Sequence, residues 1–140
     1  MAKKFRGPEI VKEIDDALDK GLRRFLINTQ SKLSAASPLD SGRLASSWFV
    51  GKGVPNRSQR PENWAEPGDK RVEVEKPSGE ITLDSDYFIS NNLPYAEIAA
   101  FDPGYSGRRG GGAGDWFTKI QNNLARDAER SFDFFLRKVK

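Results

Sequence analysis

A single helical pattern across Pro8–Ala36 constrains the fold more than any other feature of the chain. Gly7 and Pro8 suit the start of a helix, and acidic residues early with basic residues later match the helix dipole. Gly21 should weaken the middle by about 1 kcal/mol relative to alanine. At about 1.5 Å per residue the helix is roughly 40 Å long, so it either overhangs its own core or is shared with a neighbouring subunit. Its apolar positions recur at helical spacing: Ile10, Val11, Ile14, Ala17, Leu18, Leu22, Phe25, Leu26, Thr29 and Leu33.

The middle of the chain predicts a small, mainly antiparallel sheet of three or four strands within about residues 46–92. A helical turn at Gly42–Ser47 leads into a strand that begins at Trp48–Val50. Lys70–Lys76 and Glu80–Ser85 each alternate apolar and polar residues, and the turn residues between them predict a hairpin. The stretch at Asp86–Asn91 is expected to be the next strand.

Long loops separate these elements. Residues 53–69 are rich in proline and form a loop of a length usually functional or mobile; we expect it to be mobile, with Trp64 either tucked onto the surface or anchoring a partner. Residues 95–101 are a short helix or an extended piece, and residues 102–114 form a glycine-rich loop.

A last helix is expected over 115–139 with Asp115 as its cap. One subunit alone cannot easily bury the aromatic residues at the end of this helix, namely Phe132, Phe134 and Phe135. The expected fold is one α+β domain over residues 1–140.

The composition argues against catalysis. The 140 residues include no histidine and no cysteine, which removes the usual general base, the usual zinc ligands and thiolate chemistry. Asp84 and Asp86 could together bind Mg²⁺ or Ca²⁺, but without a third ligand they are best interpreted as solvated carboxylates. The glycine-rich loop lacks the Gly-Lys-Ser/Thr of a phosphate-binding loop. We therefore expect no enzyme, no metal and no cofactor. No apolar run is long enough to span a membrane, and no secretion signal follows the basic first residues.

The net charge of +3 is unevenly distributed. Residues 1–36 carry +3, residues 70–102 carry −4 and residues 103–140 carry +4. Opposite patches of this kind can meet between copies of one chain. The competing interpretation is a basic nucleic-acid-binding module, in which Arg108, Arg109 and other basic residues contact phosphate and affinity falls steeply with salt.

Two short motifs carry a family resemblance. The first is Asp40-Ser41-Gly42-Arg43-Leu44, followed by Ser47; the second is Asn91 or Asn92 followed by Tyr95-Ala96. With a long helix before them and a helix after them, the chain resembles the neck and tail-component proteins of tailed bacteriophages, the family typified by gene product 10 of phage HK97. It departs from the pattern at residues 100–104, where Ala-Phe-Asp-Pro-Gly replaces the usual Glu-x-Gly.

The resemblance implies a structural virion protein rather than an enzyme. Such a protein forms a homo-oligomeric ring, a hexamer or a dodecamer, at the head–tail junction. It lies between the portal or adaptor and the tail, assembles in the host cytoplasm, and surrounds the channel through which DNA passes. A tail-terminator or tail-completion role is the near alternative. The motif residues would then serve fold and interfaces: Gly42 in a tight turn, Arg43 bound to a carboxylate across the sheet, and Tyr95 in packing. Trp64, Arg108 and Arg109 would be contacts to partners or to the DNA channel.

Overall fold

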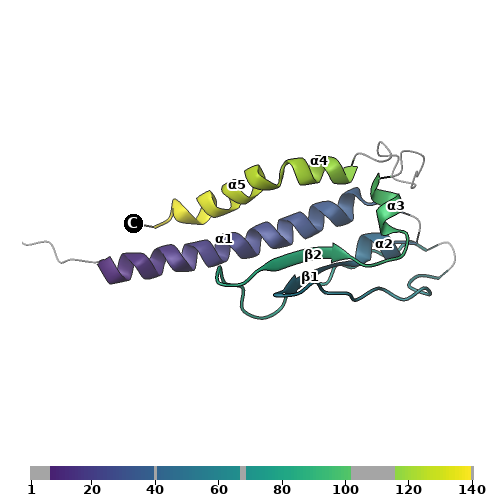
Figure 1. The fold of residues 1–140 in the computed structure, drawn as a ribbon, viewed down its shortest axis with the longest axis horizontal. Helices are drawn as coiled ribbons and strands as arrows, with labels where there is room; N and C mark the ends of the chain where they lie inside the picture. Colours follow the sequence, from purple (N-terminus) through teal and green to yellow (C-terminus); the bar gives the residue numbers. More distant parts are fainter. Residues whose placement is uncertain (1–6, 40, 67–68, 102–115, 140) are drawn as a thin grey trace, which may run out of the picture.

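The computed structural model describes residues 7–39, 41–66, 69–101 and 116–139. Helix α1 (Gly7–Ala36) runs the length of the molecule, with the chain's C-terminal part alongside it on one side and a small sheet on the other (Figure 1). The fold is therefore α+β: a long N-terminal helix, a C-terminal helix and a small antiparallel sheet. The first helix agrees with the predicted Pro8–Ala36 to within one residue.

The sheet has two strands, β1 (Trp48–Lys52) and β2 (Tyr87–Asn91), in antiparallel register from Trp48–Asn91 to Lys52–Tyr87. The short helix α2 (Arg43–Ser46) precedes β1, and α3 (Ala96–Phe101) follows β2. The helical turn at residues 42–47 is thus confirmed, and residues 96–101 are helical rather than extended.

The predicted hairpin of Lys70–Lys76 and Glu80–Ser85 is wrong. Neither segment is a strand in the described part of the chain. Side chains form the hydrogen bonds to their backbone that a neighbouring strand would otherwise form. The carbonyl of Arg71 accepts hydrogen bonds from Trp64 Nε1 (2.7 Å) and Ser46 Oγ (3.2 Å). The carbonyl of Glu75 accepts from Gln30 Nε2 (2.7 Å).

The second half of the predicted hairpin is held in the same way. The N–H of Leu83 donates to Asp19 Oδ1 (3.3 Å), and the N–H of Thr82 donates to the Tyr87 hydroxyl (2.8 Å). Alternating sequence alone does not distinguish a strand from an extended segment that side chains hold in place.

The C-terminal helix is broken where one continuous helix was predicted over 115–139. It consists of α4 (Trp116–Asn122) and α5 (Leu124–Leu136). Asn123 between them has a non-helical ψ of 1° and donates from Nδ2 to the Lys119 carbonyl (2.9 Å). Asparagine competes for backbone groups with its own side chain, so it interrupts the helix. The predicted cap, Asp115, lies outside the described residues.

An aromatic cluster joins the elements at the C-terminal end of α1. Trp48 packs edge-on against Trp116 with ring centroids 6.3 Å apart, and it stacks on Phe117 at 6.2 Å. Both buried indoles are satisfied: Trp48 Nε1 donates to Ser37 Oγ (2.8 Å), and Trp116 Nε1 donates to the Ala99 carbonyl (3.0 Å). These bonds tie β1 to the end of α1 and α4 to α3, so this end of the molecule is the core.

Helix α5 crosses α1 at Gly21. A Cβ at Gly21 would lie 2.6 Å from Phe132 Cδ1 and 2.9 Å from Phe132 Cα, so only glycine permits this approach. Further along the two helices, Lys32 Nζ and Asp127 Oδ2 form an ion pair at 2.6 Å. The first turns of α1 extend past these contacts, and Ile10, Val11 and Ile14 are exposed there.

Candidate functional site

The two sequence motifs lie together although they are about 50 residues apart in the chain. Leu44 is buried against Leu93 and Ala99, and Tyr95 and Ala96 pack on this group. We call these five residues the motif cluster.

Asn91 positions the second motif against the first. Its Nδ2 donates to the Leu44 carbonyl (2.9 Å), and its Oδ1 accepts from the Leu93 N–H (3.3 Å). Asn92 is exposed instead and bonds to the 53–64 loop at the Arg57 carbonyl (3.4 Å). Of the two asparagines that match the second motif, Asn91 is therefore the one that holds the motif cluster together.

Gly42 fixes the backbone of the first motif. Its φ is +87°, and a Cβ would lie 1.9 Å from the Arg71 carbonyl oxygen. The N–H of Arg71 donates to the Ser41 carbonyl (3.1 Å), and Ser41 Oγ accepts from the Arg43 N–H (3.2 Å). The tight turn expected at Gly42 is present, and the sequence did not indicate that residues 70–76 pass directly over it.

Arg43 and Trp64 both have structural contacts within the chain. Arg43 Nε donates to the Arg60 carbonyl (2.7 Å) rather than to the carboxylate expected across the sheet. Trp64 is buried, and the guanidinium groups of Arg71 and Arg60 lie over its ring, at 4.0 Å and 4.7 Å from the ring centroid. Trp64 is thus tucked onto its own chain, the first of its two interpretations.

The loop that carries Trp64 covers the outer face of the sheet. Gly51 allows the close approach, since a Cβ there would lie 2.1 Å from the Val54 carbonyl. Ser90 Oγ donates to the Asn56 carbonyl (2.9 Å), and the Arg60 N–H donates to Ser47 Oγ (3.2 Å). The segment expected to be a mobile loop is therefore attached to both strands.

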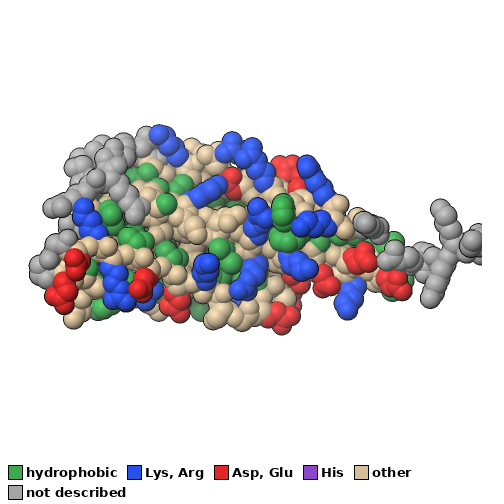
Figure 2. Space-filling model, turned by 180° about the vertical axis from the view of Figure 1, so that it is seen from behind, with side chains coloured by type: hydrophobic (Ala, Val, Ile, Leu, Met, Phe, Trp, Pro, Cys, Tyr) green, Lys and Arg blue, Asp and Glu red, His purple; other side chains and the backbone are tan. Residues whose placement is uncertain are grey.

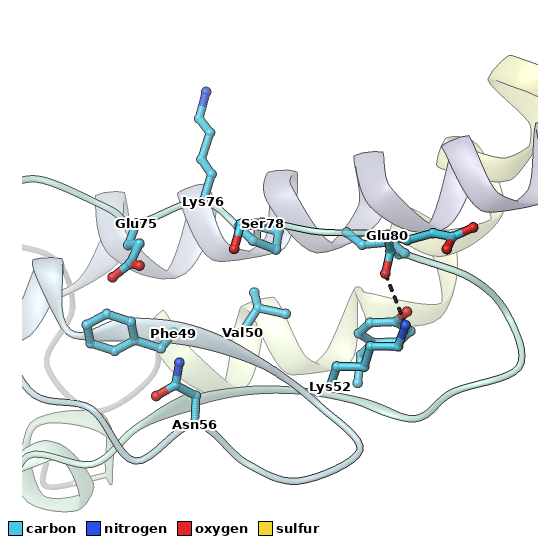
Figure 3. Close-up of a pocket in the computed structure, with 11 residues that line it drawn as sticks. Phe49, Val50, Lys52, Asn56, Glu75, Lys76, Ser78 and Glu80 are labelled. Carbon is cyan, nitrogen blue, oxygen red and sulfur yellow. Dashed lines mark hydrogen bonds between the residues drawn. The ribbon is translucent and has the colours of Figure 1, made fainter.

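Two hollows lie beside these groups. One, of about 310 Å³, is lined by Pro38, Ser41, Gly42, Arg43, Leu44, Glu62 and Tyr95. The other, of about 110 Å³, lies between β1 and residues 75–81, where Lys52 Nζ donates to the Glu80 carbonyl (3.1 Å) (Figure 3). The described residues hold no group of three potential metal ligands among His, Cys, Asp and Glu.

The two aspartates considered for a metal have different hydrogen bonds. The Asp84 carboxylate accepts a hydrogen bond from Thr82 Oγ1, and this bond is the main reason that the pKa of Asp84 is lowered from its ordinary value. Asp86 is exposed, and its backbone carbonyl accepts from the Gly53 N–H (2.7 Å). Asp84 is therefore a solvated, hydrogen-bonded carboxylate.

The surface mixes basic and apolar side chains. Figure 2 shows Lys and Arg side chains along one face, interspersed with Asp and Glu side chains and with green apolar side chains. On α5, Phe134 is exposed under two cations, Arg24 (3.9 Å from the ring centroid) and Lys138 (4.3 Å). The structure thus leaves part of the aromatic C-terminal end uncovered, as expected for the closing helix.

Gln30 and Ser46 are structural residues that the sequence reasoning missed. Gln30 is buried, and its amide joins the Trp48 and Glu75 carbonyls at 2.7 Å each. Its position in the sequence could have indicated this role. Gln30 follows Leu26 by four residues on the apolar stripe of α1, and a polar side chain buried there needs hydrogen-bond partners. Three residues named from the sequence, Asp40, Arg108 and Arg109, lie outside the described residues.

No described helix is long and apolar enough to cross a membrane. Comparisons of the chain with protein-family models, with curated proteins and with solved structures found no match.

Proposed function

We propose that this chain is a structural protein of a tailed-phage virion that forms a ring at the head–tail junction. The ring joins the portal or adaptor to the tail and surrounds the DNA channel, and the protein has no catalytic role. One observation carries the proposal. The residues behind the family resemblance, Leu44 of the first motif with Tyr95 and Ala96 of the second, pack into one cluster with Leu93 and Ala99.

The motif cluster supports the proposal, because the residues that carry the resemblance form one packed unit in the fold. Exposed apolar residues at the first turns of α1 and on α5 support a protein completed by partners, since Val11 is 58% exposed and Phe134 is 42% exposed. The absence of histidine and cysteine from the sequence agrees with a structural role.

The first test is the mass of the purified protein by light scattering, with negative-stain images of the same sample. Closed rings of uniform size support the proposal, and their symmetry decides between a hexamer and a dodecamer. Because some ring proteins assemble only on their neighbours, a monomer is then mixed with portal–adaptor complexes. Failure to form rings in either setting contradicts the proposal.

The nucleic-acid-binding module remains the second candidate. The Lys and Arg side chains along one face favour it, and the Asp and Glu side chains interspersed among them weaken it (Figure 2). Binding of double-stranded DNA is measured between about 50 and 200 mM salt, where several phosphate contacts would change affinity by orders of magnitude. Tight, salt-sensitive binding by a monomer would favour this candidate over the ring.

A further inference from the structure

Strand β2 has an open edge. The Gly53 N–H donates to the Asp86 carbonyl one register position beyond Lys52–Tyr87. Because hydrogen-bonded pairs alternate along an antiparallel ladder, the backbone groups of Tyr87, Ile89 and Asn91 point away from β1. Within the part of the chain that the structure describes, no strand pairs with this edge and no backbone partner is present for Ile89.

This edge lacks two of the features that commonly protect one. Tyr87–Asn91 contains no charged residue and no proline, the residues that commonly block further pairing. Beside it lies a groove of about 250 Å³ with an apolar lining that includes Phe25, Leu26, Phe117 and Ile120, together with Tyr87 and Ile89 of the strand itself. An open edge next to an apolar groove is the geometry that binds an added strand.

Residues 70–76 offer a second open edge. The backbone groups of Arg71, Glu73 and Glu75 bond inward, to Ser41, Ser46, Trp64, Arg60 and Gln30. Those of Val72 and Val74 have no partner among the described residues, and Val72 is 40% exposed. This alternation is that of an extended strand with one side occupied and one side open.

The side chains of this segment alternate as well. The Arg71 side chain lies over Trp64, on the outer face of the sheet, so Val72 and Val74 face the opposite way. Figure 3 shows the same alternation one step later, where Glu75 and Lys76 point in opposite directions. Val72 and Val74 are therefore on the face of the sheet that carries Tyr87 and Ile89.

The two open edges lie at opposite sides of one layer. Residues 70–80 run beside β1 in the same direction, since Ser46 bonds to Glu73 and Lys52 bonds to Glu80. The order across the layer is residues 70–76, then β1, then β2. A second copy placed in the same orientation would bring its residues 70–76 antiparallel to β2.

We propose that β2 accepts residues 70–76 of a second copy of this chain as an antiparallel strand. With Val74 opposite Ile89, the outward backbone groups of both edges pair, and Val72 falls opposite Asn91. The same register sets Lys76 opposite Tyr87. Val72 and Val74 then enter the apolar groove.

The contact joins two different surfaces, so it repeats from copy to copy and closes into a ring or continues as a filament. The inference rests on the homo-oligomeric ring of the proposed function and adds the surface by which copies meet. It requires self-association only, whereas the proposed function also requires binding to head and tail components.

The test uses cysteine pairs, because the natural chain has no cysteine. In this register Glu75 faces Phe88 as a non-hydrogen-bonded pair, with Cα atoms about 4.5 Å apart, which suits a disulfide. Full-length Glu75→Cys and Phe88→Cys proteins of different mass are mixed and oxidised. Within one copy the two positions are separated by β1, about 10 Å, so an internal disulfide does not compete.

We expect a mixed disulfide dimer from Glu75→Cys with Phe88→Cys, and little product from either variant alone. The matched control pairs Glu75→Cys with Val54→Cys, which is 69% exposed but lies on the loop and not on an edge. Cross-linking of Phe88→Cys with Ser90→Cys instead would indicate that β2 pairs with itself across a two-fold axis, and would overturn the proposal.

Rings without the Glu75–Phe88 disulfide would overturn this inference and leave the proposed function standing. A protein that stays monomeric at high concentration and gives no cross-link also overturns it. Cross-linked rings that fail to bind portal–adaptor complexes would overturn the proposed function alone.

A blocking variant gives an independent readout. Val74→Pro removes an N–H that has no partner in the single chain, and proline is tolerated at such edge positions. We expect Val74→Pro to remain folded by circular dichroism but to lose at least tenfold in self-association. Val74→Ala separates the loss of the side chain from the loss of the N–H. Unchanged self-association of folded Val74→Pro contradicts the proposal.

Discussion

At the residue scale, three glycines with positive φ differ in what surrounds them. Gly42 (φ 87°) lies against the Arg71 backbone, whereas Gly79 (φ 83°) and Gly53 (φ 78°) have open space around the position of a Cβ. Backbone conformation alone would make them equivalent. Position 42 therefore requires glycine for two reasons: its backbone is left-handed, and the Arg71 backbone leaves no space for a Cβ.

We predict that Gly42→Ala lowers the free energy of unfolding by about 2 to 5 kcal/mol, combining left-handed strain with overpacking. Gly79→Ala is the matched control and should cost only the strain, about 1 to 2 kcal/mol. Denaturant unfolding monitored by tryptophan fluorescence measures both. Equal losses in the two variants would show that residues 70–76 do not pack on Gly42.

A second residue-scale prediction concerns acid titration of Asp84. Its carboxyl pKa is lowered in the folded protein, mainly by the Thr82 hydroxyl, so it stabilises the fold above its unfolded pKa and loses that contribution as pH falls through the folded pKa. We expect Thr82→Val to raise the pKa of Asp84, and Thr82→Ser to keep it low. Titration followed by NMR of the carboxyl carbons checks this, and a pKa unchanged by Thr82→Val would exclude the hydroxyl as the cause.

At the scale of elements, the sequence predicted helices better than strands. Helix α1 spans 30 residues, and its apolar spacing repeats over many turns. Its bounds were therefore predicted to within a residue. Lys70–Lys76 has the alternation of a strand, but strand pairing depends on residues that are distant in the sequence. Here the side chains of Gln30 and Ser46 form hydrogen bonds with the backbone of this segment. The sequence indicated two separate motifs but not that they pack together, because their contact depends on the antiparallel pairing of β1 with β2.

The α1–α5 crossing reverses the expected effect of a helix substitution. By helix propensity alone Gly21→Ala should stabilise by about 1 kcal/mol, but the added Cβ meets the Phe132 side chain and backbone. We predict a net loss of about 1 to 3 kcal/mol from overpacking. Thermal unfolding measures it, with Ser31→Ala on the exposed side of α1 as the control that should not destabilise. A stabilised Gly21→Ala protein would mean that α5 does not cross at this point.

At the scale of the whole molecule, residues 53–64 form an outer layer rather than a free loop. The sheet is covered by α1 on one face and by this segment on the other, where Arg60 lies over the Phe49 ring (5.3 Å) and donates from Nε to the Ser46 carbonyl (3.1 Å). Phe49 and Trp64 are both buried under these contacts. A two-stranded sheet has little stability by itself, so this covering layer contributes to the fold.

Replacement of residues 54–64 by a short glycine–serine linker should therefore destabilise the whole domain. The linker removes Trp64 and exposes Phe49. Loss of a buried aromatic side chain costs about 3 to 5 kcal/mol, so the combined loss approaches the total stability of a domain of this size. We expect loss of the cooperative thermal transition, measured by near-ultraviolet circular dichroism. The control is Arg57→Ser with Glu62→Ser, which alters exposed side chains of the same segment and should leave the transition in place. If the linker variant unfolds cooperatively near the wild-type temperature, residues 53–64 are dispensable for folding, and a role in contacting partners becomes the better explanation for their length.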